Sequence, residues 1–153
     1  MISAKKLIYQ AVTKLLALEQ VSTAYPSSPF TPVALATTEK KISLSSVVQT
    51  ANAGLSISDG GVKIPADGKY LISTEWYFNT LGGSANSISV AIKRNSTELN
   101  SAGSTHTGGY FHTTIAPILY SLTANDVLYL YAKNNTSAVG QCSWASITIE
   151  RVE

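Results

Sequence analysis

The side chains that could act as nucleophiles, acids or bases are few and scattered in this sequence. Its 153 residues include two histidines, His106 and His112, and many serines. A hydrolase triad needs a nucleophile, a base and an acid that orients the base. Because serine is so frequent here, each histidine has one nearby by chance. We therefore interpret both histidines as incidental or exposed, and we predict no catalytic residue.

The pattern of possible metal ligands is equally sparse. His106 and His112 are six residues apart, and no Asp or Glu accompanies them to complete a zinc site. Cys142 is the only cysteine, so no internal disulfide forms, and we expect it to be a small buried strand residue. The Gly-Gly pairs lack the Lys-Ser/Thr of a phosphate-binding loop. The sequence thus predicts no metal and no cofactor.

The carboxylates do not suggest a glycosidase, which needs two of them facing one cleft. The candidates are Asp59, Asp67, Glu75, Glu98 and Asp126. Three of them lie in predicted turns, where Asp caps the backbone. Glu75 lies in mid-strand, and we expect it to form an interface contact or an ion pair with Lys93 or Arg94.

Most of the chain alternates polar and apolar residues with a period of two, which is typical of β-strands. In residues 69–78, Tyr70, Ile72, Thr74, Trp76 and Phe78 share one face. Further strands are predicted at residues 87–93, 110–122, 127–132 and 142–152. Residues 79–84 and 101–109 are rich in Gly, Ser and Thr and are expected to form loops. About eight short strands with close turns predict an antiparallel sandwich or barrel.

The N-terminal region has a different pattern. Residues 1–20 contain neither Gly nor Pro and predict an α-helix for oligomerisation or anchoring. Its apolar seam has the three-then-four spacing of a short coiled coil, formed by Ile8, Ala11, Leu15 and Leu18. A helix packed on its own domain remains an equal alternative. Residues 21–32 contain three of the five prolines and are expected to be a linker before a β-domain at residues 33–153.

The composition limits the partners. Charged residues are 13% of the chain and the net charge is +2, too little to indicate nucleic acid or an anionic membrane as a partner. Mean hydropathy is slightly above zero, which favours an oligomer that covers apolar surface. Polar residues interrupt the apolar segment 7–18, so we expect no signal peptide and no membrane insertion.

Three segments together resemble the tumour necrosis factor and complement first-component globular-head superfamily. Residues 62–73 are similar to its apolar strand, Pro-x-x-Gly-x-Tyr turn and long apolar strand. Residues 122–130 are similar to its leucine, short acidic turn and returning strand, and residues 140–149 to its final strand. The resemblance implies a jelly-roll β-sandwich of eight to ten strands that assembles as a trimer. The family's calcium-binding pattern and collagen-like stalk are not recognisable here.

By this resemblance, strands 110–122 and 142–150 lie near the three-fold axis, with Ile115, Ile118 and Trp144 at the trimer interface. A small jelly-roll trimer that lacks a secretory signal looks like a bacteriophage virion protein, for example a tail or baseplate head, a head fibre or a capsid decoration. We expect it to be made in the host cytoplasm and to contact other virion proteins.

Aromatic residues suggest where a ligand would bind, because their faces bury well with little loss of entropy. The candidate contacts to a host-surface glycan or protein are Tyr77, Tyr110, Phe111 and His112, and the further aromatic candidates are Tyr25, Tyr129 and Tyr131. The alternative function is a monomeric carbohydrate-binding β-sandwich module of a bacterial protein. Neither function involves an enzyme activity.

Overall fold

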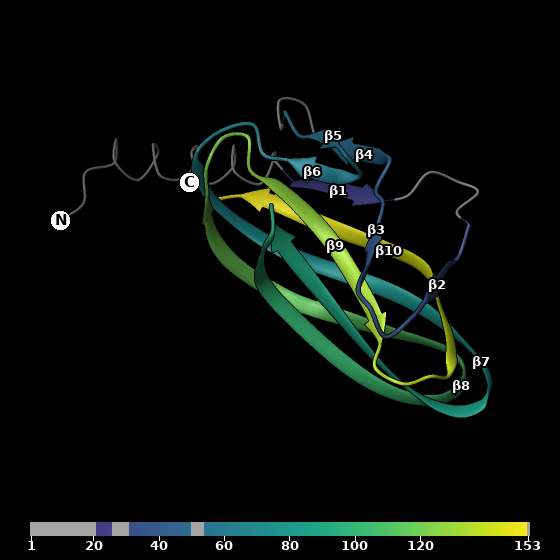
Figure 1. Cartoon of the computed structure of the whole chain (residues 1–153). Helices are drawn as coiled ribbons and strands as arrows, with labels where there is room; N and C mark the ends of the chain where they lie inside the picture. The colour runs from purple at the N-terminus through teal and green to yellow at the C-terminus, as the bar shows by residue number, and fades with distance from the viewer. Residues whose placement is uncertain (1–20, 26–30, 50–53, 153) are drawn as a thin grey trace, which may run out of the picture.

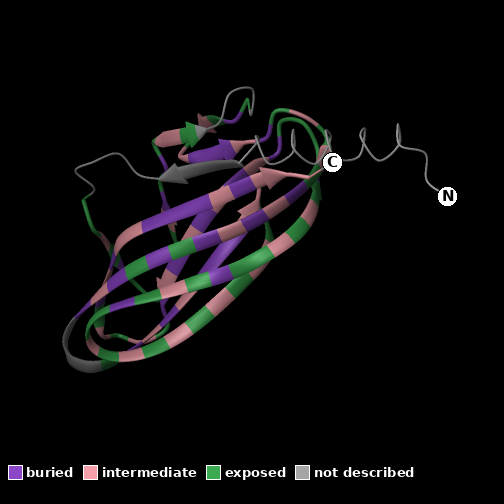
Figure 2. Cartoon of the chain, turned by 180° about the vertical axis from the view of Figure 1, so that it is seen from behind, coloured by how far each residue is buried: buried purple, intermediate pink, exposed green. Residues whose placement is uncertain are grey.

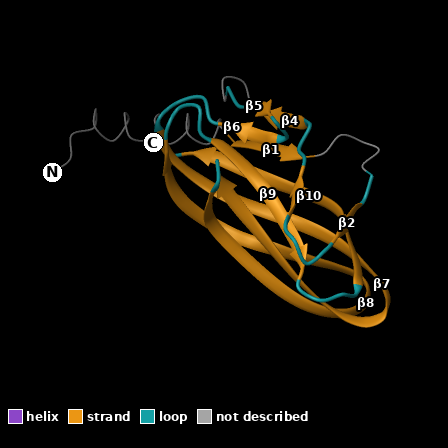
Figure 3. Ribbon diagram, in the orientation of Figure 1, coloured by secondary structure: helices purple, strands orange, loops and turns teal. Residues whose placement is uncertain are grey.

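The computed structural model describes residues 21–25, 31–49 and 54–152, and all of its regular elements are strands. The predicted N-terminal helix, with Ile8, Ala11, Leu15 and Leu18, lies outside these residues. The strands, shown in Figures 1 and 3, are β1 (Val21–Tyr25), β2 (Val33–Leu35), β3 (Lys40–Ile42), β4 (Ser46–Gln49), β5 (Ser56–Ser58), β6 (Gly61–Lys63), β7 (Gly68–Arg94), β8 (Thr97–Leu122), β9 (Val127–Asn134) and β10 (Val139–Arg151).

One antiparallel sheet curls so that its two halves enclose the core, and the long strands β7 and β8 run through both halves (Figure 1). Residues 70–81 of β7 pair with β10, whereas residues 88–94 pair with β9. Strand β8 follows β7 along both parts. We call the first half the β10 layer: β4, β1, β10, residues 68–81 of β7 and residues 109–122 of β8. The second half, the β9 layer, contains β5, β6, β9, residues 85–94 of β7 and residues 97–107 of β8.

The alternation predicted from the sequence is confirmed along the central strands. Tyr70, Ile72, Thr74, Trp76 and Phe78 are all buried, while the residues between them are partly or fully exposed. Figure 2 shows this as stripes of buried and exposed residues along the long strands. The one polar member of the row is satisfied, because the indole Nε1–H of Trp76 donates to Thr74 Oγ1 at 2.7 Å. The core therefore lies between the two layers.

Two predicted loops and part of the predicted linker are strands. Residues 79–84 continue β7, residues 101–109 continue β8, and residues 21–25 form β1, which pairs with β10 and β4. The prediction of loops was wrong because small polar residues are acceptable in a strand whose neighbour supplies a full hydrogen-bond ladder. The register shift between Thr80 and Ala85 marks where this ribbon passes from one layer to the other.

Asp59, one of the three carboxylates expected in turns, does lie in a turn, which has a clear backbone cause. Asp59 and Gly60 both have positive φ, 46° and 71°, as the two-residue hairpin between β5 and β6 requires. Within the described part of the chain, no helix is long and apolar enough to cross a membrane.

Candidate functional site

The four predicted ligand contacts lie together beside the β7–β8 pair of the β10 layer. With Phe78, they line a shallow hollow of about 310 Å³, which we call the aromatic hollow. Tyr77 is paired with His112 in the strand register, so both side chains point outward, with ring centroids 4.7 Å apart. Tyr110 is 82% exposed, whereas Phe111 is mostly buried and stacks on Phe78 at 5.2 Å. This arrangement offers aromatic surface for stacking or for a protein partner.

The predicted interface residues are divided between the core and the surface. Trp144 faces outward beside Tyr77, with ring centroids 5.5 Å apart. Ile115 is buried in the core, and Ile118 is partly buried opposite the core residue Ile72. Both isoleucines point inward although they are three residues apart, because the register shifts between Ile72 and Thr74. Ile115 therefore offers no surface for an interface.

The outward row of the β10 layer has an apolar character that the sequence did not reveal. Among the described residues, the exposed large hydrophobic side chains are Val48, Tyr77, Tyr110, Leu119 and Val139. The strand register places all of them on the outer face of this layer. An exposed apolar surface shared by several strands is typical of an interaction surface.

One serine, Ser104, does contact a histidine, His106, but the pair lacks the third member of a catalytic triad in the described part of the chain. Ser104 Oγ and His106 Nε2 lie 2.6 Å apart, and the His106 ring stacks on Phe111 at 3.9 Å. In the described part of the chain, no hydrogen bond joins His106 to a carboxylate, which a triad would need to orient its base. The described residues also contain no group of three or more metal-ligating side chains. His112 contacts Tyr77, whereas His106 contacts Phe111, so the two histidines make different contacts.

Cys142 is buried in β10, as predicted from its lone position. Burial raises the pKa of its thiol to about 12, outweighing the hydrogen bond to the Trp144 carbonyl. The thiolate is the reactive form of cysteine, so this side chain is chemically inert at neutral pH.

The charged side chains near the turns hold the fold together. Burial tends to raise the pKa of Asp126, but hydrogen bonds from Thr123 and Asn95 and the charge of Arg94 outweigh it, so the pKa lies below its usual value.

Glu75 is exposed on the outer face of the β10 layer. Neither ion pair expected for Glu75 is formed, because Lys93 and Arg94 lie in the other layer. There Lys93 pairs with Glu39 at 2.5 Å and Arg94 lies 4.0 Å from Asp126.

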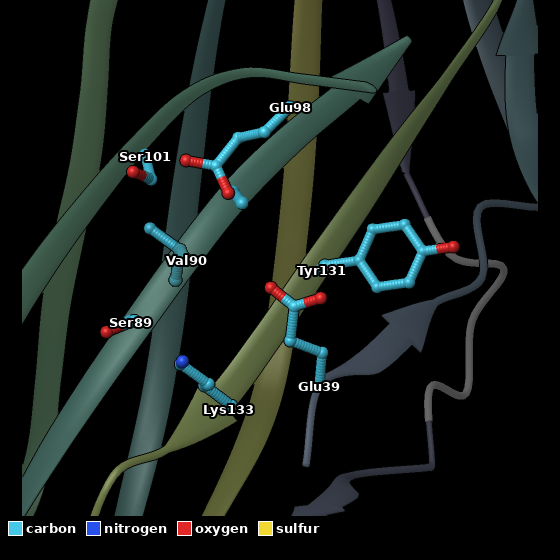
Figure 4. Close-up of a pocket in the computed structure, with 8 residues that line it drawn as sticks. Glu39, Ser89, Val90, Glu98, Ser101, Tyr131 and Lys133 are labelled. Atoms are coloured by element: carbon cyan, nitrogen blue, oxygen red, sulfur yellow. The ribbon is translucent and has the colours of Figure 1, made fainter. Parts of the chain in front are cut away.

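A second hollow, of about 240 Å³, lies on the outer face of the β9 layer, and we call it the polar hollow (Figure 4). Its lining includes Ser89 and Ala91 from β7, Glu98 and Ser101 from β8, Tyr131 and Lys133 from β9, and Glu39, which precedes β3. Ala91 pairs with Tyr131 on one side and with Ser101 on the other. A small residue between larger neighbours leaves a depression. No local pattern in the sequence marks this hollow, because its residues come from four separate segments of the chain.

These features define an all-β protein with a curled, sandwich-like antiparallel sheet. No protein-family model matches the chain, and no curated protein matches it. Among solved structures, the chain is similar to the phage protein described as "PRD1 vertex protein P5", with a TM-score of 0.58 and 18% sequence identity. The match covers 87% of this chain and 96% of that chain. At this identity the similarity establishes a shared fold.

Proposed function

We propose that this protein is a non-enzymatic structural protein of a bacteriophage virion that assembles as a homotrimer. The observation that carries the virion role is the fold similarity to a phage vertex protein, which extends over nearly all of both chains. In the virion the protein contacts other virion proteins.

The outer face of the β10 layer is the proposed trimer interface. It holds the exposed large hydrophobic residues of the described chain, and Trp144 lies among them. The sequence resemblance to the tumour necrosis factor superfamily implies a jelly-roll trimer with strands 110–122 and 142–150 near the axis. Both segments flank the first part of β7 in this layer, which supports that arrangement. Association would remove this apolar surface from water.

The oligomeric state tests the proposal directly. Sedimentation equilibrium of the full chain at micromolar concentration should give the mass of three chains. A monomer at that concentration would overturn the trimer, and a stable dimer would overturn the three-fold arrangement.

The second candidate function, a monomeric carbohydrate-binding module, is favoured by the aromatic hollow. In a monomer, the exposed faces of Tyr77 and Tyr110 would be free to stack on sugar rings. In the trimer, the same residues would lie at or near the interface. A monomer that loses glycan binding on Tyr77→Ala substitution would favour this candidate over the virion trimer.

A further inference from the structure

We propose that the polar hollow of the β9 layer is a binding site for one neutral sugar residue of a surface glycan. The site itself needs only the single chain. Its presentation in three copies rests on the proposed trimer.

The shape of the hollow follows from the strand register. Ala91 is only 4% exposed although it lies in the outward row of β7, so it forms the floor. Tyr131 forms one wall and Ser101 the opposite one, at the positions paired with Ala91. Figure 4 shows the carboxylate of Glu98 extending toward Ser101, and that of Glu39 beside Tyr131. At about 240 Å³ the hollow is small for a ligand site, which suits a single sugar ring.

The Tyr131 side of the hollow is held in place by its own contacts. Lys93 Nζ lies 4.6 Å from the centre of the Tyr131 ring and also pairs with Glu39. One side of the Tyr131 ring and the Glu39 charge are thus already engaged. Fixed side chains lose little entropy when a ligand binds, so this wall is organised in advance.

The charges around the hollow balance, which selects the class of ligand. Glu39 and Glu98 are negative, and Lys93 and Lys133 are positive. Phosphate or a polyamine would therefore gain no net attraction. Carboxylate, ammonium and hydroxyl groups side by side can accept from and donate to the hydroxyl groups of a neutral sugar. Glu98 is exposed, and although it lies opposite Lys93 and interacts with its charge, the close partner of Lys93 is Glu39. The Glu98 carboxylate is therefore the best placed acceptor for two neighbouring sugar hydroxyls.

The location also fits a surface ligand. The hollow opens on the outer face of the β9 layer, whereas the proposed interface is the outer face of the β10 layer. Trimer assembly would leave all three hollows open. Weak single sites on one particle can then bind a glycan-coated surface with high avidity.

The test is a titration of the full-length protein with sugars, followed by two-dimensional NMR. The probes are glucose, galactose and N-acetylglucosamine at millimolar concentration, with inorganic phosphate and putrescine as ionic comparisons. We expect at least one sugar to shift the amide signals of Ala91, Ser101 and Tyr131, and the two ionic probes to leave them unchanged. Shifts with the ionic probes alone, or with none of the five, would overturn the proposal.

Two isosteric variants distinguish this site from the aromatic hollow. Glu98→Gln should weaken sugar binding about tenfold, because a charged hydrogen-bond acceptor is lost. Glu75→Gln changes an exposed mid-strand glutamate on the other outer face and should leave the affinity unchanged. Equal affinity of both variants, or signal shifts confined to Tyr77, Tyr110 and His112, would refute the site. Sedimentation of the same samples reports the trimer separately, so either proposal can fail alone.

Discussion

The outer faces of the two layers are built from the same long strands but have opposite chemistry. On the β9 layer, Tyr129 and Tyr131 each lie beneath a lysine, at 5.1 Å and 4.6 Å from ring centre to Nζ. On the β10 layer, Tyr77 and Tyr110 are 46% and 82% exposed. Tyrosines thus lie beneath lysines on one face and remain partly or mostly exposed on the other.

This difference supports the proposal that the β9 face is exposed to water and the β10 face is a protein interface. Lysines that cover tyrosines pair with Asp59 and Glu39, so the β9 layer presents a solvated, charged surface. The outer face of the β10 layer has Leu119 at 53% and Val48 at 61% exposure, with Glu75 among its few charges. Because β7 and β8 contribute to both faces, the division arises along one strand rather than between domains.

The largest expected effect is that of Leu119→Asp, which tests whether the outer face of the β10 layer is the trimer interface. Leu119 is already exposed in the single chain, so the fold should survive the change. In the proposed trimer, three carboxylates would be buried without partners, at a cost of about 3–5 kcal/mol each. Sedimentation velocity should therefore show a monomer at concentrations where the original protein is a trimer.

Ser101→Asp is the matched control for this variant. It adds the same charge to the same strand, β8, but on the outer face of the β9 layer. We expect it to remain trimeric. If Leu119→Asp also sediments as a trimer, the β10 layer is not the interface.

A smaller effect is expected where β9 leads into β10 and the layers join. Asn86 and Asn134 are both fully buried, and the Asn134 amide donates to Asn86 Oδ1 at 2.6 Å and to the Ala138 carbonyl at 2.7 Å. Asn134 Oδ1 also accepts from the amide and the hydroxyl of Thr136, at 3.2 Å and 3.0 Å. Asn134→Ala removes all four bonds and should lower the free energy of unfolding by about 1–3 kcal/mol. Urea denaturation followed by tryptophan fluorescence measures this loss.

The adjacent Asn135 provides the comparison for that measurement. Its side chain is exposed and donates to Ser89 Oγ at 2.7 Å. Asn135→Ala should change the free energy of unfolding by less than about 0.5 kcal/mol. Equal losses in the two variants would show that burial of the Asn86–Asn134 pair does not matter.

The sequence predicted the inner face of this fold better than its outer faces. The row from Tyr70 to Phe78 could be predicted because alternation is a local signal, and so could the burial of Cys142. Residues 101–109 could not, since their strand depends on pairing with β7 rather than on their own composition. The inward direction of Ile118 follows from a register shift that no local pattern marks.

The two hollows also show that the sequence does not predict contacts between distant segments. Tyr77, Tyr110, Phe111 and His112 were each predicted as ligand contacts, and the strand register brings them together. The polar hollow depends on Glu39, from the segment before β3, lying beside Tyr131 of β9. No spacing in the sequence relates these two residues, so only the folded chain reveals the site.

The smallest predicted effect is a pH-dependent loss of stability when Lys93, which lies over the Tyr131 ring on the β9 layer, is replaced. The hydrogen bond to Glu39 raises the pKa of Lys93 above its usual 10.5, and it outweighs the opposing effect of burial. A raised pKa in the folded state means that the stabilisation is complete below the unfolded-state pKa and disappears as pH rises through the folded-state pKa. Lys93→Met should therefore cost about 0.5–1 kcal/mol at neutral pH. The difference from the original protein should vanish well above pH 10.5 in urea titrations.

Lys41→Met sharpens that measurement, because Lys41 also covers a tyrosine and pairs with a carboxylate. The side chain of its partner Asp59 is 78% exposed, against 37% for Glu39, so water screens the Lys41 pair more strongly. We expect the Lys41 variant to lose less stability than the Lys93 variant at neutral pH. A larger loss for Lys41→Met, or a Lys93→Met difference that persists above the folded-state pKa, would mean that these lysines act through their aliphatic stems on the tyrosine rings. The β9 face would then be held by packing rather than by charge, which would weaken its contrast with the β10 face.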